Sequence, residues 1–140
     1  MRRIAAALGL SSLGLITGSS FAQPGYDGKW YVTLRCSSIE DKRGPVKGYE
    51  LNFPATVTSG KLSAQYGAPG TPNSLTYEGE VSADGVLQIK ASGNTGPSAN
   101  TLGRVAQGTP FTYTLRGKLT DTGGEATRVE GRPCVASFSR

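Results

Sequence analysis

The stretch "DGKWYVTLRC", residues 27–36, decides the fold, because it combines the single tryptophan of the chain with one of its two cysteines. One side of the stretch is apolar and consists of Trp30, Val32, Leu34 and Cys36. The other side consists of Tyr31, Thr33 and Arg35. Alternation with a period of two residues is typical of a half-buried β-strand. The stretch is therefore predicted to be a strand that carries Trp30 and Cys36 on its inner face.

The same alternation recurs along the rest of the chain. Further strands are predicted at 48–58, 61–66, 75–82, 86–92, 110–119, 125–130 and 134–139. Helical periodicity is almost absent, and the 20 glycines and 8 prolines interrupt the chain too often for long helices. The sequence thus predicts an all-β domain of about eight strands.

The connections between these strands alternate in length. Short, glycine-containing turns are predicted at 59–60, 83–85 and 121–124, and long loops at 37–47, 67–74 and 93–109. If each strand pairs antiparallel with the next, the short turns lie at one end and the long loops at the other. This layout indicates an up-and-down barrel with one functional mouth. The 93–109 loop is interpreted either as a mobile lid or as plain disorder.

The two cysteines test whether the barrel closes. If Cys36 lies opposite Cys134, the first and last strands pair antiparallel and keep inward residues opposite each other. That register joins Leu34 to Ala136, Val32 to Phe138, and Trp30 to Arg140. A disulfide between the cysteines would close a loop of about 100 residues and stabilise the fold by about 4–5 kcal/mol. The alternative, two free thiols, is disfavoured in an oxidising compartment.

At the head of the first strand, Gly28-Lys29-Trp30 resembles the G-x-W motif of the calycin barrels, the lipocalin and avidin-type families. The resemblance implies an up-and-down barrel in which an arginine from the barrel end packs over the tryptophan. Arg140 falls where the predicted register places such a partner. The chain is also similar to small exported bacterial proteins of unknown function, which implies no activity.

The N-terminal segment has the pattern of a secretory signal peptide. Arg2 and Arg3 precede an apolar run over 4–17, and Ser20-Phe21-Ala22 fits the small-x-small cleavage rule. We therefore predict a signal peptide at 1–22, a barrel domain at 23–140, and a periplasmic or secreted protein. The alternative, a transmembrane anchor, requires about 20 apolar residues, and this run is shorter.

The charge and polarity of the sequence argue against a nucleic-acid partner and against a membrane-integral barrel. Removal of residues 1–22 leaves 118 of the 140 residues, with 13 basic and 10 acidic side chains and a formal charge of +3. These charges alternate in sign and form no basic run interleaved with aromatics, so no nucleic-acid partner is expected. The outward strand positions are polar, which argues against a barrel that is integral to a membrane.

The residue types argue against catalysis. The chain has no histidine, which removes the usual Ser-His-Asp and Cys-His sites and the commonest zinc ligand. Cysteines held in a disulfide cannot act as thiolates. Glu78 and Glu80 share a strand face and could form an acid–base pair, but alternation directs them to water. No glycine-rich phosphate loop is present. We expect no enzyme activity, no cofactor and no metal site.

The mouth offers a candidate site instead. Five aromatics are predicted to face inward near the long-loop end: Tyr49, Tyr66, Tyr77, Phe111 and Tyr113. Basic residues are predicted around them, with Arg35 and Arg104 as candidate ligand contacts among a rim that includes Lys42, Arg43, Lys47 and Arg132. A small anionic or aromatic molecule would suit such a mouth.

The alternative is that the aromatics fill the core and the loop charges are simply solvated. The loops would then dock another exported protein, as in an interaction or inhibitor module. An open interior of roughly 300 Å³ or more favours the small ligand, and a filled interior favours the protein contact.

Overall fold

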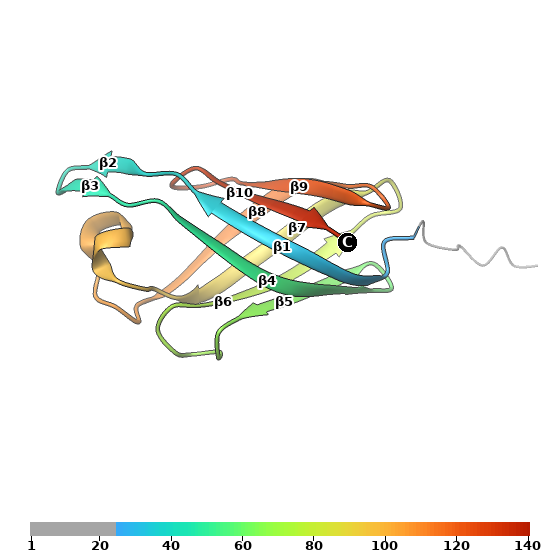
Figure 1. The fold of residues 1–140 in the computed structure, drawn as a ribbon, viewed down its shortest axis with the longest axis horizontal. Coiled ribbons are helices and arrows are strands. Elements are labelled where there is room, and N and C mark those ends of the chain that lie inside the picture. Colours follow the sequence, from blue (N-terminus) through green and yellow to red (C-terminus); the bar gives the residue numbers. More distant parts are fainter. Residues whose placement is uncertain (1–24) are drawn as a thin grey trace, which may run out of the picture.

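The computed structural model describes residues 25–140, so the predicted signal peptide lies outside the described residues. Ten strands follow one another: β1 (Gly28–Cys36), β2 (Ile39–Asp41), β3 (Gly44–Val46), β4 (Tyr49–Thr58), β5 (Lys61–Tyr66), β6 (Ser74–Val81), β7 (Val86–Asn94), β8 (Pro110–Leu119), β9 (Gly123–Arg128) and β10 (Cys134–Ser139). Eight of them form a closed antiparallel barrel in the order β1-β10-β9-β8-β7-β6-β5-β4 (Figure 1). The all-β, eight-stranded barrel predicted from the sequence is confirmed, and it is the architecture that the calycin resemblance implies.

Pairing between β1 and β10 closes the barrel in the predicted register. Cys36 lies opposite Cys134, Leu34 opposite Ala136, and Val32 opposite Phe138. The predicted disulfide is present, with its two Cα atoms 4.1 Å apart and 98 residues apart in the chain. All six of these side chains are buried, because both strands turn their alternate residues into the same core.

Strand ends differ from the predicted ones by one or two residues, and two differences affect the architecture. The predicted 37–47 loop contains a small separate hairpin, β2–β3. The seventh strand begins at Gly123 rather than 125, because two glycines let β8 and β9 approach closely. A Cβ atom at Gly117 would lie 1.8 Å from the Glu125 carbonyl oxygen, and one at Gly124 would lie 2.1 Å from the Lys118 carbonyl oxygen. These glycines are strand residues that permit close packing, not turn residues.

The short-turn end of the barrel is plugged around Trp30. The Trp30 side chain is 2% exposed, and its Nε1 donates a 2.7 Å hydrogen bond to the Tyr26 carbonyl. The Arg140 guanidinium lies 4.4 Å from the centre of the indole ring, as the register predicts. Its Nη1 donates to the Asp27 carbonyl at 3.0 Å and its Nε to the Asp121 carbonyl at 2.6 Å. Arg140 therefore links the segment before β1 to the β8–β9 turn over the core.

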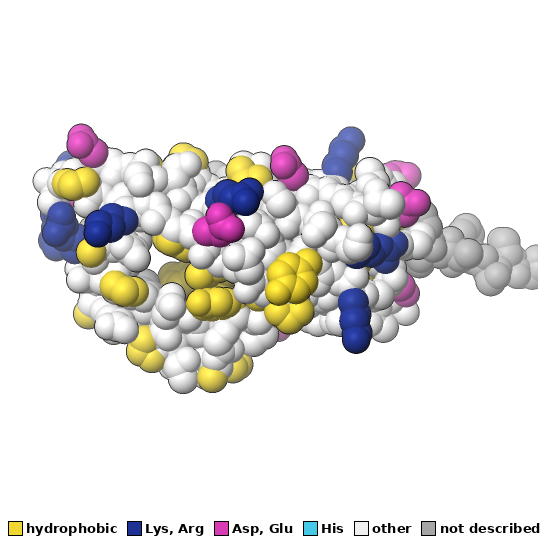
Figure 2. Space-filling view, in the orientation of Figure 1, with side chains coloured by type: hydrophobic (Ala, Val, Ile, Leu, Met, Phe, Trp, Pro, Cys, Tyr) yellow, Lys and Arg dark blue, Asp and Glu magenta, His cyan; other side chains and the backbone are white. Residues whose placement is uncertain are grey.

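The long-loop end is built differently, because one seam of the barrel is incomplete there. β4 pairs with β1 along its length, from Tyr49 to Val57. It pairs with β5 only from Ala55 to Thr58. β4 and the β5–β6 hairpin therefore separate toward the mouth (Figure 1). In the same view, Figure 2 shows a hollow with hydrophobic side chains in this region. Among residues 25–140, no helix is long and apolar enough to cross a membrane.

Arg140→Gln tests the plug. Loss of the cation–π contact and of the charged hydrogen bonds is expected to lower the free energy of unfolding by about 1–2 kcal/mol. Water should also reach Trp30, the single tryptophan, and shift its emission to longer wavelength. Urea titration followed by fluorescence measures both. Arg116→Gln on the exposed face of β8 is the control; equal effects of the two substitutions would contradict this role of Arg140.

Candidate functional site

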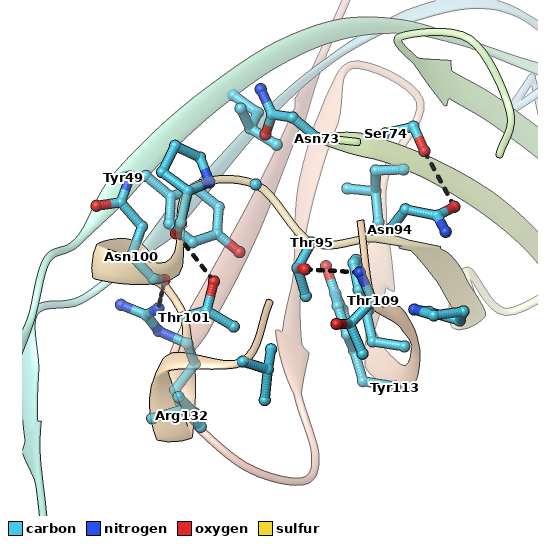
Figure 3. Close-up of a pocket in the computed structure, with 18 of the residues that line it drawn as sticks. Tyr49, Asn73, Ser74, Asn94, Thr95, Asn100, Thr101, Thr109, Tyr113 and Arg132 are labelled. Carbon is cyan, nitrogen blue, oxygen red and sulfur yellow. Dashed lines mark hydrogen bonds between the residues drawn. The ribbon is translucent and has the colours of Figure 1, made fainter. Parts of the chain in front are cut away.

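A cavity of about 470 Å³ lies at the long-loop end of the barrel. Its walls come from β4, β6, β7, β8, the end of β9 and the segment before β10, and the segment 95–109 forms its roof (Figure 3). Apolar surface predominates, and the apolar side chains in it are Leu51, Leu75, Pro97, Leu102, Val105, Pro110 and Phe111. The volume exceeds the roughly 300 Å³ typical of the smallest ligand pockets. The barrel is therefore filled at its short-turn end and hollow at its mouth.

The roof is an ordered segment that is fastened to the β2–β3 hairpin. It contains two short 3₁₀ turns, Ser98–Asn100 and Leu102–Arg104. The Asp41 carboxylate accepts hydrogen bonds from the backbone N–H groups of Gly103, at 2.8 Å, and Arg43, at 2.7 Å. These two bonds, that from Gly103 foremost, lower the pKa of Asp41. The Arg43 side chain also donates to the Gly103 carbonyl at 3.0 Å. The predicted 93–109 loop thus forms a roof that hydrogen bonds hold to the β2–β3 hairpin.

Arg132 is a buried cation in the wall of the cavity. It is 4% exposed and donates to three backbone carbonyls, those of Asn100 at 2.8 Å, Ser37 at 2.7 Å and Lys47 at 3.0 Å. Its guanidinium lies 5.2 Å from the centre of the Tyr49 ring, and its Nε has no hydrogen-bond partner. Burial lowers the pKa of Arg132. Arg132 therefore joins the roof to the barrel, and its positive charge is bound by neutral carbonyls and by no carboxylate of the described residues.

A second cation, Arg128, lies nearby at the end of β9. Its guanidinium lies 4.2 Å from the centre of the Tyr113 ring, and its Nε donates to the Glu130 carbonyl at 2.5 Å. Within residues 25–140 the one ion pair joins Arg35 to Glu50, so no acidic side chain pairs with Arg128 or Arg132. The same part of the chain has no cluster of three His, Cys, Asp or Glu side chains that could hold a metal ion.

Two tyrosines, Tyr49 and Tyr113, complete this polar corner of the cavity, and Tyr77 lies behind Tyr113. Tyr77 is fully buried and Tyr113 is 4% exposed. Their hydroxyls are neighbours, and neither makes a hydrogen bond of normal geometry. Burial raises the pKa of both phenols, as it does that of Tyr49, where the two arginines oppose the effect. All three phenols therefore stay neutral near pH 7 and can donate an O–H. In Figure 3, Tyr49 and Tyr113 reach into the space beneath the roof.

The structure brings together some of the predicted site residues and separates others. Tyr49, Phe111 and Tyr113 line the cavity, with the Phe111 and Tyr113 rings stacked at 5.7 Å. Tyr66 and Tyr77 do not line it; both pack edge-to-face against Phe53, with centroid distances of 6.1 Å and 5.2 Å. Tyr66 and Tyr77 therefore pack in the core with Phe53, outside the cavity lining.

The two predicted arginine contacts also lie outside the cavity lining. Arg35 is on the outer face of β1, where its Nε lies 3.0 Å from a Glu50 carboxylate oxygen. Arg104 is exposed on the roof, beside Gly44. Glu78 and Glu80 are exposed on the outer face of β6, as alternation predicts.

Arg128 is the functional candidate that sequence reasoning missed. The signal was present, because inward-facing Ala126 places residue 128 on the inner face of the same strand. That strand was predicted, at 125–130, without an assignment of its inner face. Polar residues that line the cavity, among them Asn73, Ser74, Asn94, Thr95 and Thr109, carried no such signal. Several of them bond to each other or to the roof, as Thr95 Oγ1 does with the Ala106 carbonyl at 2.8 Å.

Tyr77→Phe tests whether the buried hydroxyl lacks a partner. Removal of an unpaired hydroxyl relieves a desolvation cost, so the free energy of unfolding should stay unchanged or rise by up to about 1–2 kcal/mol. Chemical denaturation of ligand-free protein measures this. Tyr31→Phe, at an exposed position, is the control and should change nothing. A loss of more than about 1 kcal/mol in Tyr77→Phe alone would show that the hydroxyl is paired.

Comparison with protein-family models, curated proteins and solved structures finds no match to this chain.

Proposed function

We propose that the protein is an exported binding protein that holds a ligand with an anionic group in its mouth cavity. The carrying observation is the pair Arg128 and Arg132, which line a largely apolar cavity and have no acidic partner among the described residues. Arg132 is buried and Arg128 is half-buried, and a charge that is removed from water without a counter-ion is costly. A bound anion would remove that cost, which favours an anionic ligand over a neutral one.

The tyrosines support the same assignment. Phenols whose pKa is raised remain neutral donors, and an anion can accept hydrogen bonds from them. Tyr113 lines the cavity, and its hydroxyl makes no hydrogen bond of normal geometry within the described residues, the Tyr77 hydroxyl being its polar neighbour. Apolar walls such as Leu51, Leu75 and Phe111 would receive the rest of the ligand. Neither a nucleophile with an adjacent base nor a metal is needed for this role, and we propose binding without catalysis.

Export is part of the proposal and is supported by the disulfide. Cys36 and Cys134 are bonded in the described chain, and structural disulfides persist in oxidising compartments. The N-terminal signal pattern points the same way. The protein would then meet its ligand in the periplasm or outside the cell.

A matched pair of aromatic probes tests the charge requirement. 2-Naphthoate and 2-naphthalenemethanol have similar shapes, but only the first is an anion. We expect 2-naphthoate to bind more tightly, and Arg128→Gln to weaken it by about 10- to 100-fold, the usual effect of losing a charged hydrogen bond. Calorimetric titration measures both affinities.

Arg116→Gln is the control for this experiment, because it removes the same charge from the exposed face of β8. It should leave the affinity for 2-naphthoate unchanged. Arg132 is unsuitable for substitution, since its three carbonyl contacts hold the roof. Equal affinity for the two probes, or no binding of either, would overturn the proposed function.

A further inference from the structure

The edge of β4 that borders the cavity is unpaired. β5 covers β4 only from Ala55 to Thr58, which leaves the segment 49–54 without a neighbour on that side. The backbone hydrogen bonds made outside the strand ladders do not involve residues 49–54 either. Tyr49 and Leu51 from this segment line the cavity, so the free edge runs along its opening. An unpaired edge is a template for another strand.

The turn after β4 shows which backbone groups face this edge. Ser59 and Gly60 both have positive φ, 51° and 75°, which identifies a two-residue hairpin turn. Thr58 and Lys61 then form a hydrogen-bonded pair, and alternate residues of β4 direct their N–H and C=O groups toward β5. By the same alternation, Glu50, Asn52 and Pro54 direct theirs to the free edge. Asn52 offers both an N–H and a C=O, whereas Pro54 offers a C=O alone.

A cation stands at one end of this edge. Arg132 lies over the ring of Tyr49, the first residue of β4, whereas Pro54 lies toward the closed end. A strand that runs antiparallel to β4 would enter near Pro54 and end near Tyr49. Tyr49 lines the same cavity as Arg128, Arg132 and Tyr113, so a carboxylate on the last residue would turn inward to reach them.

We propose that the ligand is the C-terminal end of an extended polypeptide, which adds to β4 as an antiparallel strand and places its terminal carboxylate against Arg128 and Arg132. The inference rests on the proposed function, since it identifies the anion as a peptide carboxylate. Main-chain hydrogen bonds to Glu50 and Asn52 supply affinity, and alternate side chains of the peptide turn inward between Leu51 and Leu75. A small anion would fill the corner but would leave the backbone edge unused.

Selection from a library of random octapeptides displayed with free C-termini provides the probe. We expect enriched peptides to bind in solution and to lose at least about tenfold in affinity when the C-terminus is amidated, because one charge-assisted contact is removed. Failure to enrich any peptide by a protein that does bind 2-naphthoate would overturn the inference and leave the proposed function standing. Failure of both probes would overturn both.

Asn52→Pro tests the edge itself, because proline removes the N–H that faces it. Asn52→Ala is the matched control: it loses the same side-chain contact with Thr33 but keeps the N–H. We expect Asn52→Pro to weaken the enriched peptide at least about tenfold relative to Asn52→Ala, with 2-naphthoate binding equal in both. Equal peptide affinity in the two variants would overturn the inference.

A peptide modification repeats the test on the unaltered protein, should Asn52→Pro fail to fold. Backbone N-methyl groups at alternate positions of the enriched peptide remove one set of N–H donors at a time. One set should be essential for affinity and the other dispensable, because only one set of a strand faces its neighbour. Equal tolerance of both sets would contradict strand addition.

Discussion

The pairing of β1 with β10 is the constraint on which the rest of the structure depends. It closes the sheet, and the Cys36–Cys134 bond fixes its register. That register sets both ends of the barrel. It brings Arg140, one residue beyond β10, over Trp30 at the closed end. It also holds Arg132, two residues before Cys134, beside Tyr49 at the mouth, because Tyr49 lies opposite Cys36 on the other side of β1.

The two ends use the same contact, an arginine over an aromatic ring, with different electrostatic consequences. Arg140 is exposed, so water compensates its charge while its guanidinium binds backbone carbonyls. Arg132 is buried, and Arg128 lies near it without an acidic partner. At the closed end, water and carbonyl groups therefore compensate the charge of Arg140. The mouth has excess positive charge, and the Tyr77 and Tyr113 hydroxyls there make no hydrogen bond of normal geometry. This asymmetry is why the proposed ligand is an anion and why its site is the mouth.

Alternation was enough to predict the eight barrel strands, though not the β2–β3 hairpin, because burial of every second side chain is a local property of a barrel strand. Two cysteines were enough to predict the register between β1 and β10. The roof could not be predicted, since carbonyls from three distant segments converge on the Arg132 guanidinium. The open seam was also hidden, because it depends on where β5 stops covering β4. Tyr49, Phe111 and Tyr113 were placed at the cavity by their inward register, whereas Arg35 and Arg104 were chosen by position along the chain and lie outside its lining.

The proposed site depends on the two arginines at the mouth, and NMR of arginine side chains detects ligand binding there most directly. Nε–Hε resonances of ¹⁵N-labelled protein can be followed as 2-naphthoate is added. The account predicts that the signals of Arg128 and Arg132 move together and saturate, while that of Arg116 on the outer face stays in place. Movement of Arg116 with no change at Arg128 and Arg132 would contradict it.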